Sequence, residues 1–476
     1  MDTKALRQKI LDLAIHGKLV PQDPNDEPAS VLLERIKAEK ERLIKEGKIK
    51  RSKKSAKSSD TPHYENVPFE VPSSWVWCRL EDIAYVASGS TPDKTCFVEN
   101  GVPYIKMYNL RNQKIDFAYH PQYITEEVHN GKLQRSRTEV GDLIMNIVGP
   151  PLGKLAIIPT TLPQANFNQA AVLIRPYKFK EVLVSYLKVY LEEMSEINSI
   201  ATRGSAGQVN ISLTQSQNMR IPIPPLNEVR RIIEEVSKYD ILIDSLKQNI
   251  TDIQNLIAYT KSKILDLAIH GKLVLQDPND EPAIELLKRI NPDFTPCDNG
   301  HKWKLPQSWC WAKGRQIFLP MKSTKPHNDE FLYIDIDSID NKRQIINKIK
   351  SIKTANAPSR ASRYTQKGDV VFSMVRPYLR NIAKVSVDGC IASTGFYVCS
   401  PIDDLNSEYC YYLMISDYVV TGLNQFMKGD NSPSINKSHI DEWLFPLPPF
   451  PEQQRIVQKI EKLFSLLDHI KKSLEV

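Results

Sequence analysis

The stretch that decides the fold occurs twice: residues 9–36 read KILDLAIHGKLVPQDPNDEPASVLLERI, and residues 263–290 read KILDLAIHGKLVLQDPNDEPAIELLKRI. The copies differ at only four of 28 aligned positions and are offset by 254 residues. A second pair follows in the same order, because IPIPPLNEVRRI (221–232) matches FPLPPFPEQQRI (445–456) at an offset of 224. Solenoid repeats are much shorter than this, so the pattern indicates one unit of roughly 230 residues used twice, with pseudo-two-fold symmetry.

A long helix is predicted after the proline pair at 224–225. Apolar residues recur at alternating steps of three and four from Val229 to Leu267, which is the heptad pattern of a coiled coil. The same seam continues in 456–474 and, in repeat coordinates, in 6–13. We therefore expect the two ends of the chain to lie close together and to rebuild a second copy of this helix, antiparallel to the first. The residues predicted for the helix seam and for subunit contacts are Ile232, Val236, Ile243, Leu246, Ile250, Ile456, Ile460 and Leu467.

Two globular segments between the helices contain short β-type runs, such as GDLIMNIVG (141–149) and GDVVFSMV (368–375). This mixture predicts an α+β protein, with two mixed α/β globular domains joined by long antiparallel, coiled-coil-like helices. The globular segments differ strongly while the helical parts barely differ, as expected if each globular domain reads a different target. The predicted parts are an N-terminal helical segment with a basic arm (1–61), a first globular domain (62–224), a central helical spacer (225–295), a second globular domain (296–448) and a C-terminal helix (449–476).

Composition narrows the class of protein. The chain has 476 residues, of which 41% are hydrophobic and 25% charged, so it can bury sizeable cores. It contains no run of 18 apolar residues and begins with a polar segment, so neither a membrane span nor a secretory signal is expected. Seven scattered cysteines without a Cys-x-x-Cys pair argue against disulfides and zinc and favour the cytoplasm. The net charge of +7 and ten Lys or Arg between 37 and 57 favour a polyanionic partner, although the basic run can equally be a solvated linker.

Chemistry-bearing motifs are missing from the sequence. It has no phosphate-binding loop, no Gly-rich dinucleotide turn and no polar residue ahead of the Pro-Pro pairs, as an amino-methyltransferase requires. Asp335, Asp337 and Asp340 alternate on a strand-like run, which does not favour a metal site, and the Asp-Pro-Asn-Asp clusters read as turns with a helix cap. His16 and His270 each precede a glycine at a helix end, so capping is favoured over catalysis. The pattern predicts a binder with no catalytic residue and no metal.

The repeated motifs carry a resemblance to a known family. KILDLAIHGKLV with QDPNDEPA, RLIKEGKIK (42–50), the Ser-Gly-Ser-Thr-Pro turn (88–92), the two Gly-Asp pairs and the Pro-Pro-x-x-Glu-x-x-Arg-Ile runs occur in the family's order along the whole chain. With them, the sequence resembles the specificity (S) subunits of type I DNA restriction–modification enzymes. One departure is Val229-Arg230, where the family pattern has Gln-Gln or Gln-Arg.

The resemblance implies separate roles for the globular segments, the helices and the partner subunits. Each globular segment is then a target recognition domain that reads one half of a split, asymmetric site in double-stranded DNA. The helices set the spacer between the halves and dock two modification subunits, which bind S-adenosylmethionine and methylate adenine. Restriction subunits, where present, add ATP- and Mg-dependent translocation and cleavage, and this chain itself holds no cofactor. Two other classes stay open: a coiled-coil adaptor that binds no DNA, and a divergent single-chain nuclease or methyltransferase.

Residues that contact DNA can be ranked only by their chemistry. Arg and Lys suit guanine, Asn and Gln suit adenine, and Lys, Ser and Thr suit phosphates. The pair in Arg376-Pro-Tyr-x-Arg380 is the most attractive, because it follows the repeated Gly-Asp strand and adds an aromatic residue. The candidates are Ser90, Thr91, Lys106, Asn109, Arg111, Asn146, Lys154, Asn168, Gln169, Arg203 and Gln208 in the first domain, and Lys322, Lys325, Arg360, Arg363, Arg376, Tyr378, Arg380, Lys428 and Asn431 in the second.

Overall fold

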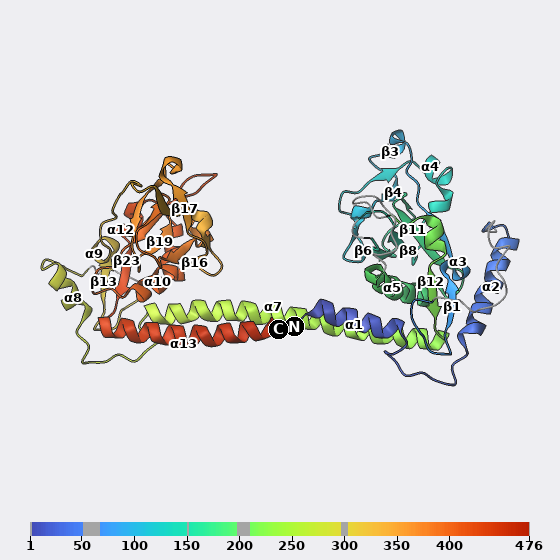
Figure 1. Cartoon of the computed structure of the whole chain (residues 1–476), viewed down its shortest axis with the longest axis horizontal. Coiled ribbons are helices and arrows are strands. Elements are labelled where there is room, and N and C mark those ends of the chain that lie inside the picture. Colours follow the sequence, from blue (N-terminus) through green and yellow to red (C-terminus); the bar gives the residue numbers. More distant parts are fainter. Residues whose placement is uncertain (1, 51–66, 150–151, 198–209, 297–302, 476) are drawn as a thin grey trace. The chain divides into compact units, whose positions relative to one another are not determined.

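The computed structural model describes residues 2–50, 67–149, 152–197, 210–296 and 303–475 (Figure 1). The chain divides into two compact units, here called the N-terminal unit (residues 2–248) and the C-terminal unit (residues 249–476). Each unit has its own hydrophobic core, and each combines a mixed β structure with packed helices. Among the described residues, no helix is both long and apolar enough to cross a membrane.

The N-terminal unit is built on a central antiparallel sheet. Its strand order is β2 (Ala84–Ser88), β11 (Ala171–Pro176), β8 (Leu143–Asn146), β9 (Leu155–Ile157). A second sheet has the order β10 (Asn166–Phe167), β4 (Val102–Ile105), β7 (Tyr123–Ile124), β3 (Phe97–Val98), and its β10–β4 pair is parallel. The remaining elements are β1 (Val76–Arg79) with β12 (Arg220–Ile223), β5 (Leu110–Arg111) with β6 (Lys114–Ile115), α1 (Thr3–Ile15), α2 (Ala29–Lys45), α3 (Leu80–Ile83), α4 (Glu126–Asn130), α5 (Lys180–Ile197) and α6 (Leu213–Gln217).

The C-terminal unit repeats this plan. Its central antiparallel sheet has the order β20 (Ile382–Lys384), β19 (Val370–Ser373), β22 (Phe396–Cys399). Its second sheet has the order β17 (Lys350–Lys353), β14 (Glu330–Ile334), β21 (Cys390–Ser393), β18 (Ala361–Thr365), again with one parallel pair, β14–β21. The remaining elements are β13 (Cys310–Lys313) with β23 (Leu444–Leu447), β15 (Ile339–Asp340) with β16 (Ile345–Ile346), α8 (Ala283–Ile290), α9 (Gly314–Ile317), α10 (Ser407–Ile415), α11 (Asp417–Asn424), α12 (Lys437–Asp441) and α13 (Phe450–Leu474).

The internal repeat predicted from the sequence is confirmed by this architecture. The Gly-Asp pairs enter equivalent strands, β8 and β19, and each of these strands lies between two antiparallel neighbours. The backbone amide of each glycine donates to the strand that follows, from Gly141 to Ile158 and from Gly368 to Val385, over 2.9 Å in both cases. The prediction of an α+β protein with two mixed domains is confirmed as well.

Helix α7 (Leu226–Ile269) is a single run of 44 residues that begins in the N-terminal unit and ends in the C-terminal unit (Figure 1). In the N-terminal unit α1 runs antiparallel to it, because Arg7 Nε contacts Asp240 Oδ1 (2.8 Å) while Gln22, beyond the end of α1, reaches Glu228 (2.5 Å). In the C-terminal unit α13 also runs antiparallel to α7, because Lys261 bonds Asp468 while Gln276, beyond the end of α7, bonds Glu452, both over 2.6 Å. The proximity of the two chain ends concerns both units and stays a prediction.

The predicted seam residues hold the chain's own helices together. Ile232, Val236 and Ile243 lie in the core of the N-terminal unit, and Ile456 and Ile460 lie in the core of the C-terminal unit. Leu467 packs against the latter core, and Leu246 and Ile250 are half-buried. In this structure they serve packing within the chain, and their predicted role in subunit contacts stays a prediction.

The near-identity of the two 28-residue copies has a structural reason. His16 Nδ1 and His270 Nδ1 each bond a carbonyl oxygen four residues back, over 2.7 Å, so the capping prediction for these histidines is confirmed. Gly17 and Gly271 follow with φ of +65° and +66°. Such a left-handed residue ends a helix at little cost only when it is glycine. Each copy therefore specifies the same helix end.

The acidic residue expected to cap the helix after the turn has another role. The N-cap positions of α2 and α8 are Pro28 and Pro282, and neither makes a side-chain capping bond. Asp26 instead accepts from Arg231 over 2.6 Å, which lowers the pKa of its carboxyl. Asp280 accepts from Arg455 over 2.6 Å in the same way. The capping prediction was wrong because the true partner lies about 200 residues away, beyond the reach of local sequence reasoning.

Candidate DNA interface

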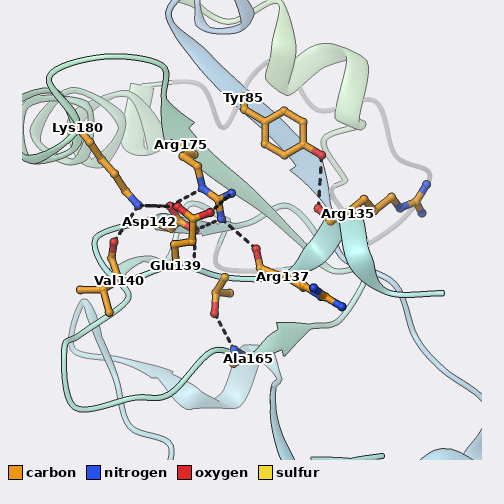
Figure 2. Close-up of polar contacts among 10 residues, drawn as sticks. Tyr85, Arg135, Arg137, Glu139, Val140, Asp142, Ala165, Arg175 and Lys180 are labelled. Carbon is orange, nitrogen blue, oxygen red and sulfur yellow. Dashed lines mark hydrogen bonds and ion pairs between the residues drawn. The ribbon is translucent and has the colours of Figure 1, made fainter. Parts of the chain in front are cut away.

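The start of strand β8 is fixed by a buried carboxylate, Asp142 (Figure 2). Asp142 pairs with Arg175 over 2.6 Å and with Lys180 over 2.7 Å. Arg175 also pairs with Glu139 (2.8 Å) and donates to the backbone carbonyl of Arg137 (3.0 Å). This network ties β8, β11 and the start of α5 together, so the loops that leave the sheet start from a rigid base.

The equivalent carboxylate in the C-terminal unit, Asp369, lacks these cations. Its Oδ2 accepts from the backbone amide of Gln366 over 2.9 Å, as Asp142 accepts from that of Glu139 over 2.7 Å. The strand register places Ser400 where the N-terminal unit has Arg175. Burial raises the pKa of Asp369, and its Oδ1 has no hydrogen-bond partner among the described residues. The two units therefore share a backbone plan but not its electrostatic support.

In the N-terminal unit, five of the predicted DNA-contacting residues meet where β2 ends beside β4 and β10. The amide of Ser90 donates to the carbonyl of Phe167, and the amide of Asn168 donates to that of Ile105, both over 3.1 Å. These bonds bring three segments of the chain side by side. The candidates that lie there are Ser90, Thr91, Lys106, Asn168 and Gln169, of which Thr91 and Gln169 are exposed and the other three half-buried.

An exposed arginine that sequence reasoning missed joins this group. Arg135 Nη2 donates to Ser90 Oγ over 3.0 Å. The backbone carbonyl of Arg135 accepts from the Tyr85 hydroxyl over 3.5 Å (Figure 2). Its place in the basic run Lys132 to Arg137 was the only signal in the sequence. Arg137 of the same run is held by His129 and Asn130. Arg135 is thus the member of the run that adds positive charge beside the predicted contacts.

Gly89 offers a test of this juxtaposition. A Cβ at this position would lie 2.1 Å from the carbonyl oxygen of Asn168, which real contacts do not permit. We expect Gly89→Ala to force Ser90 and Asn168 apart. If this corner contacts DNA, as the sequence predicts, the affinity of the N-terminal unit for DNA should fall by at least about tenfold, the equivalent of one lost base contact. Fluorescence anisotropy with a DNA duplex that carries the recognised site measures the change in affinity. Unchanged affinity would remove this corner from the interface.

Other first-domain candidates lie around the β5–β6 hairpin, and two of them are buried. Asn109 is fully buried and bonds the backbone of Lys106, Asp116 and Tyr119. Asn146 is 3% exposed, and its Oδ1 accepts from the backbone amide of Lys154. In this structure both side chains are buried and hold loop backbone in place.

The remaining first-domain candidates differ in the exposure of their side chains. Arg111 is exposed and stacks over the ring of Tyr119 at 4.0 Å, so its planar guanidinium is held in a fixed direction. Lys154 is half-buried at the start of β9. Arg203 and Gln208 lie outside the described residues.

In the C-terminal unit, four candidates line the β18 edge of the second sheet. The amide of Tyr364 donates to the carbonyl of Lys322 over 3.0 Å, and the amide of Thr394 donates to that of Arg360 over 2.8 Å. Lys322, Lys325 and Arg360 have exposed side chains. Arg363 is half-buried, and its Nε has no hydrogen-bond partner among the described residues. Three cations therefore face solvent along one edge.

The other five candidates lie on two loops that touch each other. Arg376 Nη2 donates to the carbonyl of Asn431 over 2.7 Å, and Val375 forms a β-bridge with Ser434, which also bridges Lys428. The 375–380 loop joins the same corner, because the amide of Met374 donates to Gly395, next to Thr394. Arg376, Tyr378, Lys428 and Asn431 are exposed. Arg380 instead bonds the carbonyl of Ile415 (3.0 Å) and the carboxylate of Asp417.

The described ranges contain no cluster of three His, Cys, Asp or Glu side chains that could hold a metal ion. Asp335 accepts from the amide of Ser338 and pairs with Lys350 over 2.6 Å. Asp340 accepts from the amides of Lys342 and Arg343. These aspartates shape turns, so what the geometry offers is a set of polar, mostly cationic loops for binding.

Comparison with known proteins decides the family. The family model "Type I restriction modification DNA specificity domain" matches residues 72–255 and 319–476, more than half of the chain. The chain belongs to the type I restriction–modification DNA specificity family. Each match covers most of the globular part of one unit, so both units contain a DNA specificity domain, and the resemblance read from the sequence is confirmed.

Two curated members of the type I specificity family align along nearly the whole chain. The EcoEI specificity subunit of Escherichia coli is 27% identical over 561 residues, with 99% of this chain and 91% of that protein covered. The EcoAI specificity subunit of Escherichia coli is 28% identical over 546 residues, with 98% and 90% covered. A chain from a solved type I restriction–modification system, studied for its assembly and conformational transition, has a TM-score of 0.53 at 18% identity and covers 86% of this chain and 94% of its own. This last likeness supports the fold.

Proposed function

We propose that this chain is the non-catalytic specificity subunit of a multisubunit type I restriction–modification enzyme, in which each unit reads one half of a split, asymmetric DNA site. The observation that carries the proposal is the contrast between the two units. Their central sheets are equivalent, whereas the exposed residues at the loops differ, with Thr91 and Arg135 in one unit and Arg360 and Arg376 in the other. Two copies of one scaffold with different polar loops suit two different half-sites. The helices then set the spacer between them.

One apolar position that is exposed in both copies of the repeat supports the docking of two modification subunits. Leu242 on α7 and Leu466 on α13 are equivalent in the repeat, and each is 56% exposed. Ile470, four residues after Leu466, is 48% exposed on the same helix face. Exposed leucine and isoleucine beside a packed seam mark a surface that a partner covers. One modification subunit on each unit would explain why the exposed position occurs twice.

The chemistry of the assembly then belongs to other chains. The modification subunits would bind S-adenosylmethionine and methylate adenine, and restriction subunits, where present, would use ATP and Mg. This chain would orient them on the DNA and hold none of these cofactors itself. The proposed compartment is the cytoplasm, where the DNA is.

The decisive experiment is co-expression with the neighbouring modification subunit in a methylation-free host, followed by long-read mapping of methylated adenine. We expect one motif of two short specified blocks around a fixed run of unspecified bases. Methylation by this chain alone would instead indicate a divergent single-chain methyltransferase. An intact complex that binds no DNA in a gel shift would indicate the adaptor class.

The docking surface is tested by placing a charge on it. Leu466→Asp and Leu242→Asp each put a carboxylate where an apolar contact is proposed, so we expect each variant to lose one of two modification subunits and the double variant to lose both. Native mass spectrometry of the complex counts the subunits. Ser465→Asp adds the same carboxylate at an exposed position of α13 that faces away from both Leu466 and the helix seam, so it serves as the matched control. A double variant that still binds two modification subunits contradicts the proposal.

A further inference from the structure

The loop after the Gly-Asp strand begins and ends with a residue of left-handed backbone in both units, but the residues themselves differ. In the N-terminal unit its sequence is Gly-Pro-Pro-Leu-Gly (149–153), with φ of +82° at Gly149 and +72° at Gly153. In the C-terminal unit it is Arg-Pro-Tyr-Leu-Arg (376–380), with φ of +47° at Arg376 and +55° at Arg380. An offset of 227 residues aligns both left-handed positions, and the same offset aligns the two Gly-Asp pairs.

Glycine adopts left-handed backbone at little cost, whereas an arginine in this conformation is strained by contact of its Cβ with the neighbouring carbonyl. At both aligned positions the N-terminal unit has glycine, which adopts this backbone conformation without the strain. Strain of this kind persists where the side chain does something the relaxed residue cannot do. We therefore expect each arginine side chain to make a contact that offsets the backbone strain.

Arg380 has such a contact inside the protein. Its guanidinium bonds the carbonyl oxygen of Ile415 at the end of α10 and the carboxylate of Asp417 at the start of α11. Asp417 in turn accepts from the hydroxyl of Ser262 on α7. Arg380 therefore anchors the loop to three helices of its own unit, which accounts for its strained backbone.

Arg376 has no comparable support. Its side chain is exposed and makes one hydrogen bond within the described residues, to the carbonyl of Asn431 in the neighbouring loop. The backbone beneath it is nevertheless well fixed, because the Arg376 amide donates to Pro433 over 2.8 Å and Pro377 is buried. The strained backbone therefore holds the guanidinium of Arg376, a charged and planar group, in a fixed direction towards solvent. Lys428, equally exposed, comes from the loop that contacts it.

We infer that Arg376 is a specificity-determining residue of the C-terminal unit, presented to the edge of a guanine in its half-site, and that Arg380 is the positioning residue that holds its loop. The guanidinium fork matches O6 and N7 of guanine in the major groove, and an adjacent lysine suits a phosphate. The inference rests on the proposed function. It also predicts an asymmetry: the glycine-ended loop of the N-terminal unit has no side chain to read a base at the position of Arg376.

The test compares Arg376→Gly with Arg376→Ala in the full chain co-expressed with its modification subunit. Both variants remove the guanidinium, so both should relax one specified guanine in one block of the methylated motif and leave the other block unchanged. Affinity for a duplex of the wild-type motif should fall by about 5- to 150-fold, as expected for one bidentate base contact. Only the glycine relieves the strain, so Arg376→Gly should unfold at a higher temperature than Arg376→Ala, by about 2–4 °C.

Two further variants complete the test. Gln344→Gly replaces another left-handed residue of the same unit (φ +56°), so it should leave the motif unchanged. Arg380→Gly should weaken the same half-site and also lower the melting temperature, because it removes the anchor.

The outcomes separate two failures. A wild-type chain that yields no split motif overturns the proposed function. A wild-type split motif that Arg376→Gly and Arg376→Ala leave unchanged in sequence and affinity overturns this inference alone.

Discussion

Replacing Asp142 by Asn is expected to destabilise the N-terminal unit by about 3–5 kcal/mol, the usual effect of removing one partner of a buried ion pair. Asp142 is fully buried, and the substitution would leave Arg175 and Lys180, themselves about three-quarters buried, with the 54% exposed Glu139 as their shared anion. Hydrogen exchange of amides in β8 and β11, followed by mass spectrometry, reports the free energy of opening in this unit. Unchanged protection would show that Glu139 alone can hold both cations.

The equivalent substitution in the C-terminal unit should have the opposite sign. Asp369 is buried and has no ion pair among the described residues, and burial raises its pKa against the smaller opposing effects of Ser400 and Lys322. A raised folded-state pKa means that the contribution of this carboxyl to stability is complete below its unfolded-state pKa of about 3.9 and is lost as pH rises through the folded-state value. Asp369→Asn cannot ionise, so at neutral pH it should stabilise this unit by on the order of 1 kcal/mol.

A pH series distinguishes the two carboxylates. The advantage of Asp369→Asn over wild type should shrink as the pH falls towards 4, because the wild-type carboxyl is then protonated. Protection of amides in β19 and β22 gives the measurement. An advantage that does not vary with pH would mean that Asp369 does not titrate in the folded unit.

Gly271→Ala is expected to destabilise the C-terminal unit by about 2–4 kcal/mol, because two penalties combine. Its φ of +66° strains any residue with a Cβ, and that Cβ would lie 2.4 Å from Cγ of Pro306. The helix end, the turn after it and the segment that leads to Trp309 would have to move apart. Urea unfolding monitored by amide protection of α8 and β13 checks the expectation.

The repeat provides the matched variant. Gly17 has φ of +65°, and its Cβ would lie 2.5 Å from Cγ of Pro72, so Gly17→Ala should cost the N-terminal unit a similar amount. Gly47→Ala is the control for strain without a clash, because φ is +71° but no atom lies within 4 Å of the added Cβ. Its effect should be the smallest of the three. Equal effects at all three glycines would assign the cost to strain alone.

The scaffold could be predicted well from the sequence because the residues that form it occur twice in the chain. The repeat fixed the equivalence of the two units, and the heptad pattern predicted α7 and the seam residues Ile232 and Ile456. The role of Asp26 was missed because local turn chemistry suggests a cap, whereas the actual partner is Arg231 on another helix.

The candidate interface could be predicted only by residue type. Asn109 and Asn146 have the right chemistry for adenine, but both are buried and bonded to the backbone, and burial follows from packing that no local pattern reveals. Arg376 and Arg380 looked alike in the sequence, yet one is exposed and the other is bonded to α10 and α11. Their left-handed backbone becomes predictable once Gly149 and Gly153 are aligned with them.

Helix α7 contributes to two separate cores, and this has a consequence for the way the chain melts. Val236 and Ile243 are buried in one core and Ile264 and Ile269 in the other, whereas no residue from 244 to 256 is buried. The hydrophobic core of neither unit extends into that stretch, so burial of apolar side chains adds little to the stability of the helix there. Cooperativity should therefore stop there, and calorimetry should resolve two heat-absorption peaks, with one half of α7 surviving the loss of the other.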